Sequence, residues 1–98
     1  MTEHSKRPTM RVVVGGSYTP LTFVGREAWA LKELVDAGDR GVSSLEHIGP
    51  RLSHYVMKLR RAGLDIETGE ELHRGRFSGW HARYRLRSEV EVLEACAA

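Results

Sequence analysis

Basic side chains are concentrated in one short stretch of this chain, PRLSHYVMKLRRAG at residues 50–63. Lys and Arg bind phosphate groups, and Arg can also pair bidentately with the O6 and N7 atoms of guanine. Read as a helix, the stretch separates apolar from polar side chains, because helical residues return to one face every three or four positions. The apolar face carries Leu52, Val56 and Leu59, and the opposite face carries His54, Met57, Lys58 and Arg61. This pattern predicts a short helix that packs on its apolar face and offers a cationic face to a polyanion.

The basic residues of the whole chain are separated from the acidic ones. The 98 residues include 15 Lys and Arg and 13 Asp and Glu, so the net charge is only +2. Nine basic residues nevertheless lie in two segments without any acid, four at 51–61 and five at 72–88. A solvated helix face usually mixes the two signs to gain ion pairs between neighbouring turns. The segregation therefore indicates a surface for nucleic acid rather than an ordinary solvated face.

Two groups of residues are predicted to make the contacts. The helix supplies Arg51, Ser53, His54, Lys58 and Arg61, and the later segment supplies Arg74, Arg76 and Arg83. The alternative for the later segment is a flexible loop whose aromatic side chains, Phe77 and Trp80, pack back over a sheet, and for Trp80 we favour this alternative. Arg85 and Arg87 are expected to point to solvent from the outer face of a strand.

The sequence predicts neither catalysis nor a bound metal or cofactor. It has no Gly-rich phosphate loop with its Lys, no nucleophile elbow and no pair of carboxylates in an apolar setting. The histidines lack the H-x₃-H spacing of a zinc site, and the one cysteine, Cys96, is far from most of them in sequence. A lone cysteine fits a reducing compartment, and no apolar run is long enough for a membrane span or a signal peptide. We therefore expect a cytoplasmic protein.

The elements before the basic helix are predicted from apolar patterns and turn residues. Residues 1–9 are expected to form a disordered basic arm. The apolar runs 10–14 and 21–24 predict a hairpin, because Gly15-Gly16-Ser17 between them favours a turn. The stripe of apolar residues in 26–37 then predicts a helix.

One domain, residues 10–95, is expected to hold all the ordered elements. Ser43 and Glu46 form a capping box, which predicts a second, short helix before the basic one. After the basic helix, alternating residues at 64–68 and 83–87 predict two strands, joined by a long basic loop at 69–82. Ser88 as a cap, followed by acids in the first turn, predicts a last helix at 88–95.

This order of elements resembles a winged helix-turn-helix domain. The segment VVVGG…LTFVGREAWALKEL is similar to the opening of the OmpR-like effector domain of bacterial response regulators. The segment YVMKLRRAGLDIET…ARYRL resembles the recognition helix and wing of small bacterial and phage winged-helix proteins. The likeness covers about residues 10–87. No receiver domain is expected in the chain, so the resemblance implies no control by phosphorylation.

The resemblance implies an α+β fold with a three-helix core, an N-terminal β-hairpin and a C-terminal two-stranded wing, to which the sequence adds a short C-terminal helix. It also implies that helix 50–61 enters the major groove of duplex DNA while the wing, 69–83, contacts the backbone. We therefore predict a small transcriptional regulator that binds double-stranded DNA.

One short helix offers few contacts, so we expect a homodimer or a partner protein, with the dimer surface on the C-terminal helix or the N-terminal hairpin. The alternative is a winged-helix module for protein–protein interaction, whose basic face docks an acidic partner. RNA binding is a weaker third hypothesis, because few aromatic side chains for stacking on single-stranded bases share one face.

Overall fold

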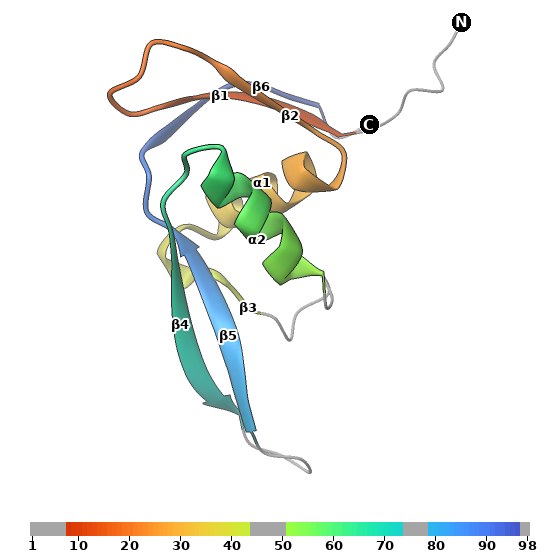
Figure 1. Ribbon diagram of the computed structural model, residues 1–98, viewed down its shortest axis with the longest axis vertical. Helices are drawn as coiled ribbons and strands as arrows, with labels where there is room; N and C mark the ends of the chain where they lie inside the picture. The colour runs from red at the N-terminus through yellow and green to blue at the C-terminus, as the bar shows by residue number, and fades with distance from the viewer. Residues whose placement is uncertain (1–7, 44–50, 74–78, 97–98) are drawn as a thin grey trace, which may run out of the picture.

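Two helices lie beside two small antiparallel sheets in the computed structural model of the chain (Figure 1). The structure describes residues 8–43, 51–73 and 79–96. The strands of one sheet are ordered β2–β1–β6, and those of the other β3–β5–β4. The first sheet covers one side of the helices, and the β4–β5 hairpin projects away from their other side (Figure 1). This arrangement leaves the hairpin largely outside the core.

The predicted N-terminal hairpin is confirmed. Strand β1 (Thr9–Val14) pairs antiparallel with β2 (Leu21–Val24), and Met10 lies opposite Phe23. Met10, Val12 and Phe23 are buried, because alternate residues of a strand face the same side of a sheet. The strand begins at Thr9, so its predicted start at residue 10 was one residue late. Residues 1–7 of the predicted basic arm lie outside the described residues.

Helix α1 (Arg26–Ala37) has the bounds that its apolar stripe predicted. Its buried side chains include Ala28, Leu31 and Leu34, which pack in the core. A single turn of 3₁₀ helix, η1 (Gly38–Arg40), follows, and then the two-residue strand β3 (Val42–Ser43).

Helix α2 (Leu52–Arg61) is the predicted basic helix. Leu52, Val56 and Leu59 are at most 1% exposed, so the apolar face is confirmed. The short helix predicted from the capping box lies in residues 44–50, outside the described residues, and Ser43 itself belongs to β3. The described residues hold two α-helices, so the three-helix core is not seen.

The wing strands are longer than the sequence predicted. Strand β4 (Ile66–His73) pairs with β5 (Gly79–Leu86) from the Ile66–Leu86 pair to the His73–Gly79 pair. The prediction of a loop over 69–82 was therefore wrong at both of its ends. Opposite charges that face each other across the two strands stabilise a β-pair, and Glu67 lies opposite Arg85 in this hairpin.

The predicted C-terminal helix at 88–95 was also wrong. Residues Val90–Cys96 form strand β6, which pairs antiparallel with β1. Val90 lies opposite Val14 and packs against the core, whereas Val92, opposite Val12, is 39% exposed. Without β6, the main-chain groups along that edge of β1 would have no strand to pair with.

The buried core joins both helices to both sheets. Its fourteen apolar side chains are Met10, Val12, Phe23, Ala28, Ala30, Leu31, Leu34, Val42, Leu52, Val56, Leu59, Leu64, Ile66 and Tyr84. Residues of α2 supply three of them, so the opposite face of α2 is held in a fixed position by the core.

Candidate nucleic-acid interface

The end of α2 follows from local chemistry. Three basic residues lie in its last turn, where positive charge interacts favourably with the negative end of the helix dipole. The residue after the C-cap is Gly63, with φ of 110°, and the Gly63 N–H donates to the carbonyl of Arg60. Glycine adopts this left-handed conformation readily, which suits the position just after the end of a helix.

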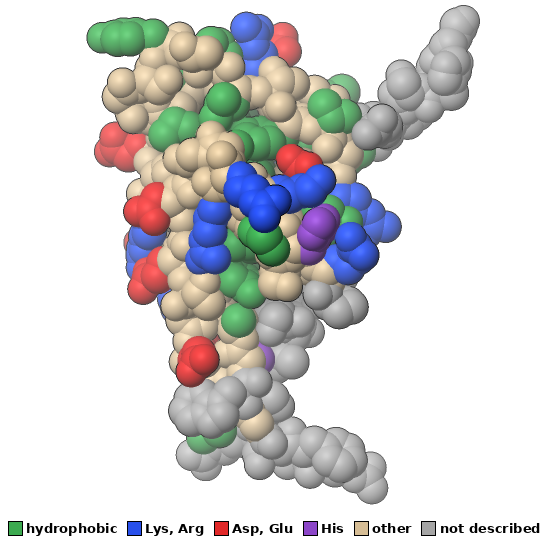
Figure 2. Space-filling view, viewed as in Figure 1, with side chains coloured by type: hydrophobic (Ala, Val, Ile, Leu, Met, Phe, Trp, Pro, Cys, Tyr) green, Lys and Arg blue, Asp and Glu red, His purple; other side chains and the backbone are tan. Residues whose placement is uncertain are grey.

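The outer face of α2 carries the five helix residues predicted as contacts. Arg51, Ser53, Lys58 and Arg61 are exposed, and His54 is half-buried. Lys, Arg and His side chains gather over and beside α2 in the middle of the face that Figure 2 shows. Acidic side chains line one edge of the same face (Figure 2).

The N-terminal end of this face is ordered by an aromatic side chain. The Arg51 guanidinium carbon lies 5.9 Å from the centre of the Tyr55 ring, within the range of a cation–π contact. The His54 and Tyr55 rings meet edge to face, with their centres 5.2 Å apart. Tyr55 thus restrains the two side chains at the start of the face.

Lys58 has an acidic neighbour that the sequence did not reveal. Its Nζ atom lies 3.3 Å from Oε2 of Glu27, a residue of α1. Both side chains are partly exposed, so a phosphate can compete with this carboxylate for Lys58. Within the described part of the chain, neither Arg51 nor Arg61 forms an ion pair.

Arg60, the remaining basic residue of α2, serves the fold. Its Nε donates to the carbonyl of Ile66 over 3.1 Å, and one terminal nitrogen donates to Oγ1 of Thr68 over 2.6 Å. These bonds tie the end of α2 to the start of β4. The residue therefore positions the hairpin relative to the cationic face.

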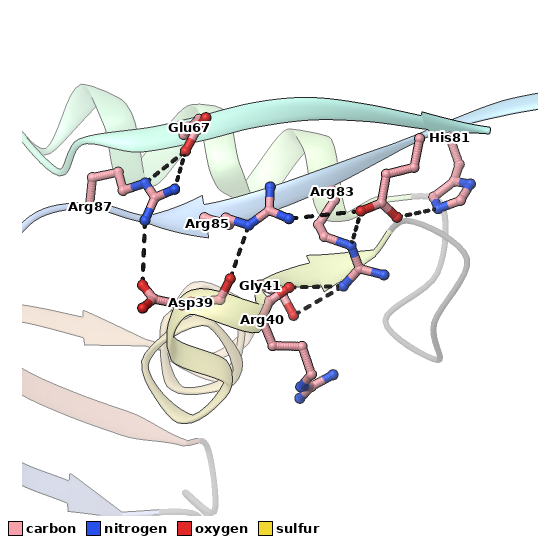
Figure 3. Close-up of polar contacts among 9 residues, drawn as sticks. Asp39, Arg40, Gly41, Glu67, His81, Arg83, Arg85 and Arg87 are labelled. Atoms are coloured by element: carbon pink, nitrogen blue, oxygen red, sulfur yellow. Dashed lines mark hydrogen bonds and ion pairs between the residues drawn. The ribbon is translucent and has the colours of Figure 1, made fainter. Parts of the chain in front are cut away.

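A second cluster of charges lies along the β4–β5 hairpin, on the side that faces η1 (Figure 3). The Nε atom of Arg83 donates to Glu71 Oε2 over 2.7 Å, and a terminal nitrogen donates to the carbonyl of Arg40 over 3.0 Å. Nε2 of His81 lies 3.1 Å from the other oxygen of Glu71. The carboxylate of Glu71 thus holds two residues of β5, and Arg83 joins the hairpin to η1.

The next two arginines, Arg85 of β5 and Arg87 just after it, are bound in the same way (Figure 3). Nε of Arg85 donates to the carbonyl of Asp39 over 3.0 Å, and Nε of Arg87 donates to Glu67 Oε1 over 2.7 Å. The prediction that Arg85 and Arg87 point to solvent was therefore wrong for Arg85, whose side chain is 26% exposed. The Arg87 side chain is 42% exposed, but its guanidinium also binds Glu67 and Asp39. The acid-free segment 72–88 obtains its counter-charges from β4 and η1.

A family model described as a winged helix domain matches residues 20–96, more than half of the chain. The chain belongs to the winged helix domain family. No curated protein and no solved structure matches the chain significantly. Winged helix domains are typically non-catalytic and are compatible with DNA binding.

Within this winged helix, the β4–β5 hairpin is the predicted wing, and it follows α2, the predicted recognition helix, in the chain. Ser53, His54, Lys58 and Arg61 lie on α2, and Arg51 is its N-cap residue. Arg74 and Arg76 lie outside the described residues, as does the side chain of Trp80, so the predictions for them stay predictions. Arg83 lies in the charged cluster between the β4–β5 hairpin and η1 rather than on the face of α2.

Two further properties concern only the part of the winged helix that the structure describes. None of its helices is long and apolar enough to cross a membrane. No three His, Cys, Asp or Glu side chains in that part come together in a way that could hold a metal ion. Cys96 is a free thiol at the exposed end of β6.

Glu71→Gln is expected to lower the melting temperature at pH 7 by about 2–5 °C, as for a partly exposed ion-pair network. The hydrogen bond from Arg83, aided by His81, holds the pKa of Glu71 below its usual value of 4.5. Because the pKa of Glu71 is lower in the folded than in the unfolded protein, its ionised carboxylate stabilises the fold above about pH 4.5. This stabilisation is lost as the pH falls through the pKa of the folded protein. The difference between the two proteins should therefore shrink from pH 7 to pH 3 in thermal unfolding followed by circular dichroism. A difference that does not change with pH would contradict the ionic role of Glu71.

Proposed function

We propose that this winged helix binds double-stranded DNA, with α2 in the major groove and the wing against the sugar–phosphate backbone. The single observation that carries the proposal is the outer face of α2, where Arg51, His54, Lys58 and Arg61 project from a helix without any acid. The inner face of the same helix is fully buried, which supports a fixed presentation of these side chains. The role of a small transcriptional regulator is part of this proposal.

The dimensions of α2 suit such a contact. Ten residues make a helix of about 15 Å, and the major groove of B-DNA is about 12 Å wide, enough to admit a helix. The outer residues from His54 to Arg61 span about 10 Å, or roughly three base pairs. One copy therefore offers a short reading face, and useful affinity, around 10⁻⁸ M, would require a second copy or a partner protein.

The proposed contacts differ in kind. Arg51, Lys58 and Arg61 are proposed to bind phosphates or guanine, and Ser53 and His54 are proposed to donate or accept hydrogen bonds. Arg74 and Arg76 are proposed to contact the backbone from the wing. For Arg83 we propose a smaller part in contact, because its guanidinium already binds Glu71 and two main-chain carbonyls.

The test is the affinity for a labelled random duplex, measured by fluorescence anisotropy from about 50 to 200 mM salt. Each neutralised phosphate contributes about −0.9 to the slope of log affinity against log salt. Three contacts from α2 and two from the wing predict a slope of about −4.5. The absence of binding at 50 mM salt would contradict the proposal.

One observation favours a second candidate function. Lys58 already binds the carboxylate of Glu27, so this face can accept acidic side chains as well as phosphates. A winged-helix module that docks an acidic protein partner is the function we would then assign. Binding to a poly-glutamate peptide but not to duplex DNA, in the same anisotropy assay, would support this alternative.

A further inference from the structure

Met57 is an apolar side chain at the centre of the cationic face. It is 45% exposed, midway along α2, and adjacent in sequence to Lys58. Other large apolar side chains are exposed in the described residues, but each of these lies in a strand or a turn. Met57 alone among them projects from a helix, and it projects between His54 and Arg61, one turn away on either side.

The fold gives no reason for an apolar side chain at this position. Met57 belongs neither to the buried core nor to the partly buried residues that pack against it. Lys, Gln or Glu would favour the helix about as well and would be better hydrated on an exposed face. A single exposed methionine is common on protein surfaces, but this one lies where the proposed base contacts are made.

The major groove offers one apolar group that suits such a side chain. Each base pair presents hydrogen-bond donors and acceptors there, and thymine adds its 5-methyl group. In the proposed docking, cations at the ends of α2 would lie nearest the phosphates on either side, and a residue on the outer face at the middle of the helix would lie nearest the floor of the groove. A methionine side chain has three rotatable bonds and a polarisable sulfur, so it adapts to an apolar contact of this size.

We propose that Met57 contacts the 5-methyl group of a thymine, so that the preferred DNA site has a T·A pair opposite the centre of α2. This inference rests on the proposed function, and names part of the sequence that α2 reads. Burying one methyl group is worth about a fourfold change in affinity. The contact therefore predicts a preference at one base pair rather than a large part of the total affinity.

The experiment first selects a preferred duplex from a random pool with the wild-type chain. Each thymine is then replaced singly by deoxyuridine, which lacks the methyl group but keeps the pairing edge and O4. We expect one replacement to weaken wild-type binding about fourfold. Met57→Ala should weaken binding to the thymine duplex by a similar factor and should bind the thymine and uracil duplexes equally.

Leu93→Ala is the matched control, because Leu93 is 42% exposed on β6 and also loses an apolar side chain. This variant should keep the wild-type discrimination between thymine and uracil, and circular dichroism should show that all the proteins are folded. Duplex binding without discrimination at any thymine would overturn the inference and leave the proposed function standing. Discrimination that persists in Met57→Ala would also overturn it, since another residue would then read the methyl group. No duplex binding at all would overturn both.

Discussion

Replacing Lys58 and Arg61 together with alanine is expected to weaken duplex binding about 50-fold at 100 mM salt. Each lost phosphate contact removes about 0.9 from the salt slope, which is close to a tenfold loss of affinity at this salt concentration. In the native protein, Lys58 Nζ lies 3.3 Å from Oε2 of Glu27. The Lys58→Ala change therefore also leaves the Glu27 carboxylate unpaired beside the DNA. The slope of log affinity against log salt should therefore fall by about 1.8.

The matched control for this variant is Lys32→Ala with Arg11→Ala. It removes one Lys and one Arg, so the net charge changes by the same amount. Lys32 is on α1 and pairs with Asp36, near the Ala95 and Cys96 end of β6, and Arg11 lies on β1. We expect this control to bind DNA with nearly wild-type affinity and slope. An equal loss in both double variants would assign binding to net charge alone and contradict the role of α2.

Gly41→Ala is expected to destabilise the protein by about 3–4 kcal/mol, a large share of the 5–15 kcal/mol typical of a domain. Gly41 has a φ of +73°, a conformation that side chains with a Cβ rarely adopt. A Cβ atom there would also lie 2.6 Å from the main-chain oxygen of Tyr84 and 2.7 Å from Cγ of Arg85. The turn into β3 would have to move away from β5. Thermal unfolding should show a loss of more than about 12 °C.

Gly38→Ala separates the two causes of this effect. Gly38 also has a positive φ, +58°, but a Cβ atom there would meet no atom within 4 Å. We expect a loss of only about 1–2 kcal/mol, the cost of the backbone conformation by itself. Equal melting temperatures for the two variants would mean that the close approach of Gly41 to β5 does not matter for stability.

Helices α1 and α2 and the N-terminal hairpin follow from the sequence, because short-range patterns specify them. The helical stripe of α1 predicts Arg26–Ala37, and α2 has its apolar face on Leu52, Val56 and Leu59. These side chains must be removed from water whatever else the chain does. The cationic face of α2, with its five candidate contacts, follows from the same periodicity. The winged helix family was expected from the resemblance of two segments of the sequence, and the match over residues 20–96 confirms it.

The C-terminal segment was decided by the tertiary structure. Val90 and Val92 alternate with Glu89 and Glu91, which fits a strand, but Ser88 and the acids also fit the start of a helix. Local patterns cannot choose between the two. The pairing of β6 with β1 favours the strand, since it satisfies main-chain groups and packs Val90 against the core.

The ion pairs around the proposed site also depend on the tertiary structure. A segment that contains no acidic residue can still lie beside acidic side chains in the folded chain, because elements distant in sequence supply them. Glu27 of α1 reaches Lys58, and Glu71 of β4 reaches Arg83. Sequence alone thus determined which residues are basic and which face of α2 they share. Only the packing of α1, η1 and β4 decided which of these cations bind the protein itself, since ion pairs depend on distances in the folded chain.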